Sequence, residues 1–140
     1  CWNIESIRQR HTDKQCNDIS LTFWSALLSG AKDRNIDVSI SVEDLWRLYE
    51  KQNNRCALSG VKIYFDRSNK NTTASVDRID SSKGYTMNNI QLVHKIINFM
   101  KGTLSNDNFI QWCVLITDCQ LNNANISFDG LNLNQKCRKG

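Results

Sequence analysis

The sequence has 140 residues, 40% of them hydrophobic and 23% charged, and its formal net charge is +4 at pH 7. This composition is typical of one soluble globular domain, and no apolar run approaches the roughly 20 residues that a transmembrane helix needs, so a membrane protein is excluded. The mild excess of positive charge is compatible with a polyanionic partner but does not identify one.

The first third of the chain predicts an arm, a helix and a short strand. Residues 1–17 are polar without a clear period, and we expect an N-terminal arm there. Apolar residues at helical spacing predict a helix over 20–34, with Asp18 or Ser20 as its N-cap. Alternation of apolar and polar residues then predicts a strand over 36–40.

A second helix and a β-hairpin are expected next. The helix is predicted over 42–53, where Ser41 and Asp44 stand at the spacing of a capping box. Two β-rich runs, 61–65 and 73–79, flank a short polar segment, and we predict that they pair as a hairpin.

The last part of the chain predicts a loop, two helices and a tail. Residues 81–89 lack a period and read as a loop, whereas 92–101 has helical spacing and is followed by Gly102, a good helix terminator. A final helix is expected after its cap Ser105, and the Asn-rich residues 119–140 are expected to form a tail. The residues predicted to face inward on the final helix are Phe109, Trp112, Cys113 and Ile116.

These elements predict one α+β domain over 18–118, with helices packed around a β-hairpin and a following helix. The chain has six cysteines, and an even number permits a secreted disulfide framework. Against it, no CxxC pair occurs, and Cys113 falls in an apolar helical pattern where a buried thiol is the usual outcome. We therefore favour a reducing, intracellular setting.

Two oxygen-bearing side chains mark a candidate metal site. Asp77 lies in the second predicted strand of the hairpin, and Asn98 lies on the helix that follows. Carboxylate and amide oxygens with open coordination positions suit Mg²⁺ or Mn²⁺ better than Zn²⁺. His94 is four residues before Asn98, so the two share one face of a helix. The alternative is that all three are ordinary capping or surface groups.

The stretch "ASVDRIDSSKGYTMNNIQLVHKIINFMK", from Ala74 to Lys101, resembles the signature of HNH (ββα-metal) endonucleases of the phage and bacterial branch. That signature reads approximately "ASLDRIDSxKGYxxxNxxWVHKxxNxMK". The likeness covers about 20–116, most of the chain. It implies a ββα-metal (His-Me finger) core in which Asp77 and Asn98 hold one divalent cation. It also implies that Asn89 holds the loop by hydrogen bonds to backbone and orients the neighbouring catalytic residue.

One position departs from the family pattern. Where most members have a histidine that acts as general base, this chain has Arg78, and arginine remains protonated in proteins. Its planar fork suits a phosphate oxygen or the charge that develops on phosphorus. His94 is then the best candidate base by residue type, since histidine titrates near neutral pH, with Tyr64 and Tyr85 as weaker candidates.

Histidine at position 94 has a second interpretation. In zinc-bearing relatives this position is one of four structural thiolates, and the four positions here hold Cys56, Ser59, His94 and Ile97. Two of these residues are poor zinc ligands, so we expect no structural zinc and a structural hydrogen-bonding role for His94 as the alternative.

Basic residues around the motif predict contacts with DNA phosphates. Arg78, Lys83, Lys95 and Lys101 are the candidates, and a solvated helix face is the alternative for the last two. Asp80 and Ser81 are expected to fix the loop through local hydrogen bonds to backbone amides, with a supporting role of Asp80 beside the metal as a second interpretation.

The prediction is a metal-dependent DNA endonuclease that hydrolyses phosphodiester bonds with one Mg²⁺ or Mn²⁺ ion and leaves 5′-phosphates, a polarity that only the resemblance implies. The alternative is a DNA-binding or partner-binding module with a degenerate, weakly active HNH fold, because the usual base is absent. The expected location is the cytoplasm of a bacterial or phage-infected cell. Cutting of both strands commonly needs a homodimer, and the sequence identifies no interface.

Overall fold

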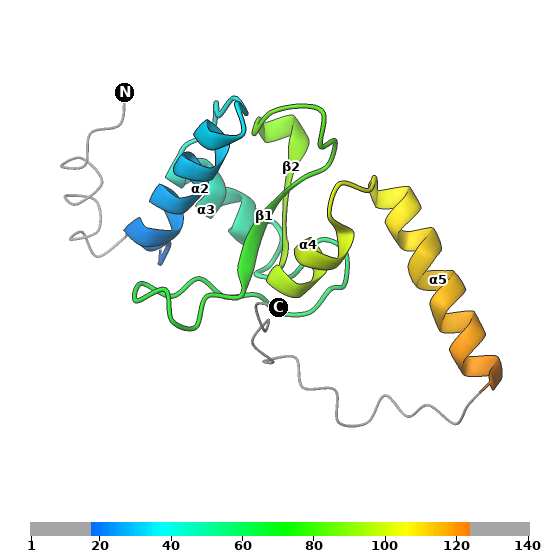
Figure 1. Ribbon diagram of the computed structural model, residues 1–140. Coiled ribbons are helices and arrows are strands. Elements are labelled where there is room, and N and C mark those ends of the chain that lie inside the picture. The colour runs from blue at the N-terminus through cyan, green and yellow to red at the C-terminus, as the bar shows by residue number, and fades with distance from the viewer. Residues whose placement is uncertain (1–17, 124–140) are drawn as a thin grey trace.

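The computed structural model describes residues 18–123, so the predicted arm and the end of the predicted tail lie outside the described residues. A two-stranded sheet lies between two helices on one side and a short helix on the other, and a last helix extends away (Figure 1). This architecture confirms the predicted α+β class. The elements are α2 (Leu21–Asp33), α3 (Val42–Lys51), β1 (Ala74–Arg78), η1 (Met87–Asn89), β2 (Ile90–His94), α4 (Lys95–Lys101) and α5 (Asn106–Asn123).

Helices α2 and α3 begin where the sequence predicts. The Ser20 hydroxyl accepts a hydrogen bond from the Phe23 amide at 3.0 Å, which makes Ser20 the N-cap of α2. At the start of α3, the Asp44 amide donates to the Ser41 hydroxyl at 3.2 Å and the Ser41 amide donates to the Asp44 carboxylate at 2.9 Å. This reciprocal capping box satisfies amides that the first helical turn leaves without a partner.

The strand pairing differs from the prediction. β1 pairs antiparallel with β2, in a register that runs from Ala74 opposite His94 to Arg78 opposite Ile90. The predicted hairpin between 61–65 and 73–79 is wrong. The hydrogen bonds between the two segments all involve Tyr64, whose carbonyl accepts from the amides of Thr73 and Ala74 and whose amide donates to the Thr73 hydroxyl.

Helix α4 begins later than predicted, because the residues before it form strand β2. Residues 90–94 form β2 and α4 begins only at Lys95, so the predicted helix over 92–101 is too long. Adjacent apolar residues at 92 and 93 fit a helix and a buried strand equally well, and burial of all five β2 residues favours the strand. Gly102 ends α4 with a positive φ of 55°, as the sequence predicts. The predicted strand over 36–40 is reduced to a single bridge between Val38 and Tyr85.

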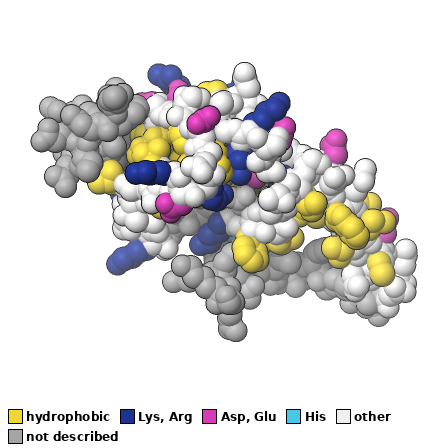
Figure 2. Space-filling view, turned by 45° about the horizontal axis from the view of Figure 1, so that its top comes forward, with side chains coloured by type: hydrophobic (Ala, Val, Ile, Leu, Met, Phe, Trp, Pro, Cys, Tyr) yellow, Lys and Arg dark blue, Asp and Glu magenta, His cyan; other side chains and the backbone are white. Residues whose placement is uncertain are grey.

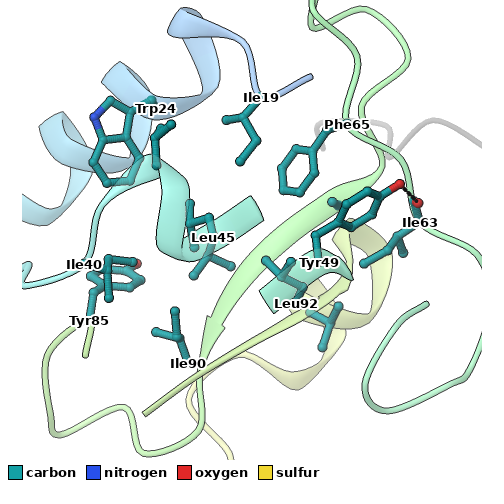
Figure 3. Close-up of a cluster of buried hydrophobic side chains, with 14 of the residues drawn as sticks. Ile19, Trp24, Ile40, Leu45, Tyr49, Ile63, Phe65, Tyr85, Ile90 and Leu92 are labelled. Atoms are coloured by element: carbon teal, nitrogen blue, oxygen red, sulfur yellow. Dashed lines mark hydrogen bonds between the residues drawn. The ribbon is translucent and has the colours of Figure 1, made fainter. Parts of the chain in front are cut away.

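The hydrophobic core lies between the sheet and helices α2 and α3. Figure 3 shows Leu45 of α3 between Trp24 of α2 and the β2 residues Ile90 and Leu92, and all four belong to the core. The Tyr49 hydroxyl reaches across the core and donates to the Ile63 carbonyl at 2.9 Å. This packing fixes one face of the sheet and leaves the other face to α4.

Helix α5 projects from this body (Figure 1). Its cap is Ser105, whose hydroxyl accepts from the Asn108 amide at 3.2 Å, and Phe109 is buried as predicted. Trp112 and Ile116 are 58% and 59% exposed, so the prediction that they face inward is wrong. The helix also continues through Asn123 into the segment predicted as a tail.

Two further expectations concern the described residues as a whole. Within residues 18–123, no helix is both long and apolar enough to cross a membrane. Cys56, Cys113 and Cys119 are free thiols, and the other three cysteines lie outside the described residues.

Candidate functional site

Asp77 lies in the middle of the face of the sheet that packs against α4. Strand alternation places Ser75 and Asp77 on this face, and Gln91 lies directly opposite Asp77 on β2. The Asp77 side chain is 4% exposed, and its Oδ2 accepts from Gln91 Nε2 at 2.8 Å. Gln91 Nε2 also donates to the Asn106 side chain at 2.9 Å, which ties the start of α5 to the site.

Lys101 is the counter-ion of this carboxylate. Its side chain is fully buried, and Nζ lies 3.1 Å from Asp77 Oδ1 and 3.0 Å from Asp77 Oδ2. A third hydrogen bond runs from Nζ to the Arg78 carbonyl at 3.2 Å. The prediction that Lys101 binds DNA phosphates from the surface of the helix is therefore wrong. The seven-residue helix α4 turns its last residue inward, where a buried lysine needs an acidic partner.

Asn98 brings its carboxamide to the same strand. Its Nδ2 donates to the Ser75 hydroxyl at 2.6 Å and to the Val76 carbonyl at 3.4 Å, and this carbonyl belongs to the peptide that joins Val76 to Asp77. Within residues 18–123, Asn98 Oδ1 makes no hydrogen bond. Asn98 on α4 thus lies against the strand that carries Asp77, with its amide oxygen left available.

Arg78 is held at the rim of the site by backbone carbonyls. Its Nη1 donates to the carbonyls of Ser81 and Lys83 at 2.7 and 2.8 Å, and its guanidinium lies 5.5 Å from the centre of the Tyr85 ring. Carbonyl partners fix the group without neutralising its charge. The remaining N–H groups of the fork make no hydrogen bond inside residues 18–123, so they are available to an anion.

Asn89 stabilises the loop between the two strands through hydrogen bonds to its backbone. Its Oδ1 accepts from the Asp80 amide at 2.8 Å, and its Nδ2 donates to the carbonyls of Asp80 and Gly84 at 3.0 Å each. Only 6% of Asn89 is exposed, and none of these three bonds leaves the loop. The predicted hydrogen bonds to backbone are present, and they fix the turn that supports Arg78.

His94 lies on the other face of the sheet. The register pairs it with Ala74, on the core side together with Val76 and Leu92, whereas Asp77 points toward α4. Its Nδ1 accepts from the Ile96 amide at 3.2 Å, which makes His94 the N-cap of α4. His94 is 5% exposed, and it is not among the residues that line the cavity described below.

The positions that correspond to a zinc site also lie away from this face. The Ser59 amide donates to Cys56 Sγ at 3.4 Å, and Ile97 packs against the hydrophobic core. Among residues 18–123, no three His, Cys, Asp or Glu side chains gather as a metal site. A cation at the candidate site would therefore depend on a carboxylate and an amide.

A cavity of about 650 Å³ opens between α2, the outer edge of β1 and the end of α4. Both Asp77 and Asn98 line it, and so do three cationic residues, Arg34, Arg78 and Lys95. Since Asp77 is already neutralised by Lys101, the cavity has a net positive charge.

Lys95 lines this cavity and also a second one, together with Arg67 and Lys70. Lys83 does not line either cavity. Its side chain is 72% exposed and faces Asp80 at 3.8 Å. The Ser82 hydroxyl and amide donate to Asp80 and lower the pKa of that carboxyl, which is the local loop-fixing role predicted for it.

Sequence reasoning missed Arg34, Gln91 and the inward orientation of Lys101. Arg34 follows α2 and lies 44 positions before Arg78, so only the tertiary fold joins them. Gln91 could have been found once β1 and β2 were paired, because it faces Asp77 directly.

The donors present fit a hard divalent cation in kind. The Asp77 carboxylate offers about four lone-pair positions, of which Lys101 and Gln91 occupy three. With Asn98 Oδ1 this gives two oxygen donors beside a cavity, and Mg²⁺ commonly keeps several waters in addition to one or two protein ligands. The Lys101 ammonium shares the carboxylate, so the affinity for a second cation is expected to be modest.

No protein family model matches the chain, and no solved structure matches it. The chain is similar to an uncharacterized protein of Acanthamoeba polyphaga mimivirus, with 26% identity over 117 residues. This match covers 79% of the chain and 20% of the viral protein, so the chain spans about one fifth of the length of that curated relative. The relative is described without a function and brings none to this chain.

Proposed function

We propose that this protein is a metal-dependent DNA endonuclease of the HNH type that hydrolyses phosphodiester bonds. The observation that carries the proposal is the single cavity in which the oxygen donors Asp77 and Asn98 lie beside Arg34, Arg78 and Lys95. Anionic substrates and a hard cation both suit such a mixed lining. The consecutive order of β1, the connecting loop, β2 and α4 also supports a ββα-metal core.

Each residue has a defined part in this proposal. Asp77 and Asn98 would hold Mg²⁺ or Mn²⁺, which when bound polarises a phosphate oxygen and lowers the pKa of water. Arg78 binds a non-bridging oxygen of the scissile phosphate and stabilises the charge that develops there, since its fork is held in place before the substrate arrives. Asn89 keeps that fork in position through the loop.

The proposed general base differs from the sequence prediction, which favoured His94. His94 is not among the residues that line the cavity, and its Nδ1 caps α4, so we do not assign it the role of general base. Tyr85 lines the cavity, whereas Tyr64 lines the second cavity. Solvent that enters the open cavity is then the simplest acceptor for the proton of the attacking water.

A second candidate function is a DNA-binding module that cleaves poorly. The specific observation in its favour is the ion pair between Lys101 and Asp77, because an ammonium already occupies much of the carboxylate that a cation would use. Arg78 in place of a basic histidine points the same way. In this candidate the cationic cavity binds phosphates without hydrolysis.

Supercoiled plasmid separates the two candidates. The protein is incubated with Mg²⁺, Mn²⁺ or EDTA, and nicked and linear forms are separated on a gel. The nuclease proposal expects nicking that requires metal and falls by about two orders of magnitude in Asn98→Ala. Asn88→Ala, an exposed asparagine on η1, is the matched control and should cut like the wild type. Equal trace nicking by wild type and Asn98→Ala in every metal supports the binding module instead.

A further inference from the structure

Tyr85 organises two arginines that are far apart in the sequence. Arg34 Nη2 donates to the Tyr85 hydroxyl at 3.3 Å, and the Arg78 guanidinium lies 5.5 Å from the centre of the Tyr85 ring. The tyrosine itself is 6% exposed and is packed beside Ile40 in the core (Figure 3). One guanidinium is thus placed at the polar end of a fixed ring and the other lies over its face.

Both guanidiniums are fixed by carbonyl groups and not by carboxylates. Arg34 Nε donates to the Gly30 carbonyl at 3.0 Å, and Arg78 Nη1 donates to the carbonyls of Ser81 and Lys83. Within residues 18–123, neither arginine forms an ion pair with an acidic side chain. Two positive charges held around one ring repel each other, and an anion that contacts both would relieve that repulsion.

An ordinary structural role explains only part of this arrangement. Arg34 is the C-cap residue of α2, where a cation is favoured by the helix dipole, and this accounts for its bond to Gly30. It does not account for the second bond, which Arg34 makes to the Tyr85 hydroxyl. Nor does it explain why both arginines line the same 650 Å³ cavity with Lys95.

We infer that Arg34 and Arg78 form a phosphate clamp that binds the backbone of DNA beside Asp77 and does so without a metal. Arg34 is an additional DNA-binding residue, and Tyr85 is a positioning residue that sets its direction. Fork-shaped donors suit phosphate oxygens better than lysine does. The inference rests on the proposed function in one respect only, which is that DNA is the anion.

The test measures binding in EDTA, where no cleavage occurs. A fluorescein-labelled DNA duplex of about 20 base pairs, long enough to cover one protein footprint, is titrated by fluorescence anisotropy at several salt concentrations. Arg34→Gln should weaken binding about tenfold, since it removes a charge-assisted contact, and should reduce the slope of log affinity against log salt by about one. Arg34→Lys should restore the slope but only part of the affinity. Tyr85→Phe should lower the affinity by a smaller factor, because Arg34 keeps its charge but loses its hydrogen bond to the Tyr85 hydroxyl.

Arg47→Gln is the matched control. Arg47 lies on α3, its side chain is 77% exposed, and it lines neither the main cavity nor the second one. It should leave both affinity and salt slope unchanged. Arg34 is exposed too, so Arg34→Gln should melt at the wild-type temperature, and a melting curve checks this.

The inference is overturned if Arg34→Gln binds within twofold of the wild type, if Arg47→Gln weakens binding equally, or if the wild type does not bind the duplex. These outcomes are independent of the plasmid result. A protein that never nicks DNA but loses salt slope in Arg34→Gln has the clamp without the nuclease. A metal-dependent nuclease with an unchanged Arg34→Gln has the nuclease without the clamp.

Discussion

At the scale of single residues, the buried pair of Asp77 and Lys101 has the largest consequences. Both side chains are withdrawn from water, and the ammonium contacts both carboxylate oxygens. Such a pair is weak support for stability compared with apolar residues, but removal of one partner leaves the other charge buried and unpaired. Lys101 therefore ties the stability of the fold to the state of the proposed metal ligand.

Lys101→Met tests this coupling. In EDTA, the variant should lose about 3–5 kcal/mol of unfolding free energy, because the Asp77 carboxylate remains buried without a counter-ion. Millimolar Mg²⁺ should recover part of this loss, since a cation on Asp77 replaces the ammonium and stabilises only the folded state. Urea unfolding with and without Mg²⁺ measures both effects.

The double variant Asp77→Asn with Lys101→Met is the control, because it has neither charge. It should show no response to Mg²⁺. Equal Mg²⁺ responses in all three proteins, or none in Lys101→Met, would contradict the coupling.

At Gly84 the surrounding backbone leaves no room for a side chain. A Cβ at this position would lie 2.7 Å from the Asp37 carbonyl oxygen. The same oxygen accepts a hydrogen bond from the amide of the next residue, Tyr85. We expect Gly84→Ala to lower the unfolding free energy by about 1–3 kcal/mol, the usual cost of overpacking. Gly30→Ala is the contrast, because its Cβ meets only Arg34 Nη2 at 3.6 Å inside a helix, and it should stabilise by up to about 1 kcal/mol. Thermal melts that rank the two variants in the opposite order would refute this account.

At the scale of elements, the boundary between β2 and α4 decides the role of His94. The residue ends the strand and caps the helix through Nδ1. His94→Ala should therefore destabilise the fold by about 1–3 kcal/mol, from the lost cap and the space left in the core. His94→Asn should recover the capping part of this loss, since asparagine is a preferred N-cap.

Cleavage by both His94 variants at saturating metal distinguishes structure from chemistry. We expect less than a threefold loss of nicking rate once each variant is folded. A tenfold or larger loss in His94→Asn with wild-type stability would return His94 to the role of general base.

The loop that holds the Arg78 guanidinium should weaken in acid. Donation from Ser82 lowers the pKa of Asp80 below its ordinary value of 3.8, so the ionised form is favoured in the folded state. The stabilisation is present above the unfolded pKa and is lost as the pH falls through the folded value. Between about pH 5 and pH 2, the urea midpoint should fall more steeply in the wild type than in Asp80→Asn, and equal slopes would contradict this.

The elements also show what the sequence could and could not predict. Caps such as Ser20, Ser41 and Gly102 act within one helical turn, so a linear sequence reveals them. The sequence did not predict the pairing of β1 with β2. The adjacent apolar residues Leu92 and Val93 in "IQLV" break the alternation of apolar and polar residues that marks a strand. The motif singled out Asp77 and Asn98, and both line the cavity, whereas Arg34 and the inward turn of Lys101 depend on contacts between distant segments.

At the scale of the whole molecule, the body and α5 play separate roles. The sheet, α2 and α3 enclose the core, and the cationic cavity lies between α2, β1 and α4. Helix α5 contributes Phe109 to this body and then extends outward (Figure 1). Figure 2 shows hydrophobic side chains along the outer part of this helix. The cavity is lined by residues of the body, whereas Asn106 at the start of α5 accepts from the Gln91 side chain that holds Asp77.

The most direct test of the central claim is a titration with Mn²⁺ in which the free ion is measured by electron paramagnetic resonance. The account expects one Mn²⁺ per chain in the wild type, binding weakened by about tenfold or more in Asn98→Ala, and unchanged binding in the control Asn88→Ala. A wild type that leaves all Mn²⁺ free at millimolar concentration, or an Asn98→Ala variant that binds it as tightly as the wild type, would contradict the claim that Asp77 and Asn98 hold a shared cation.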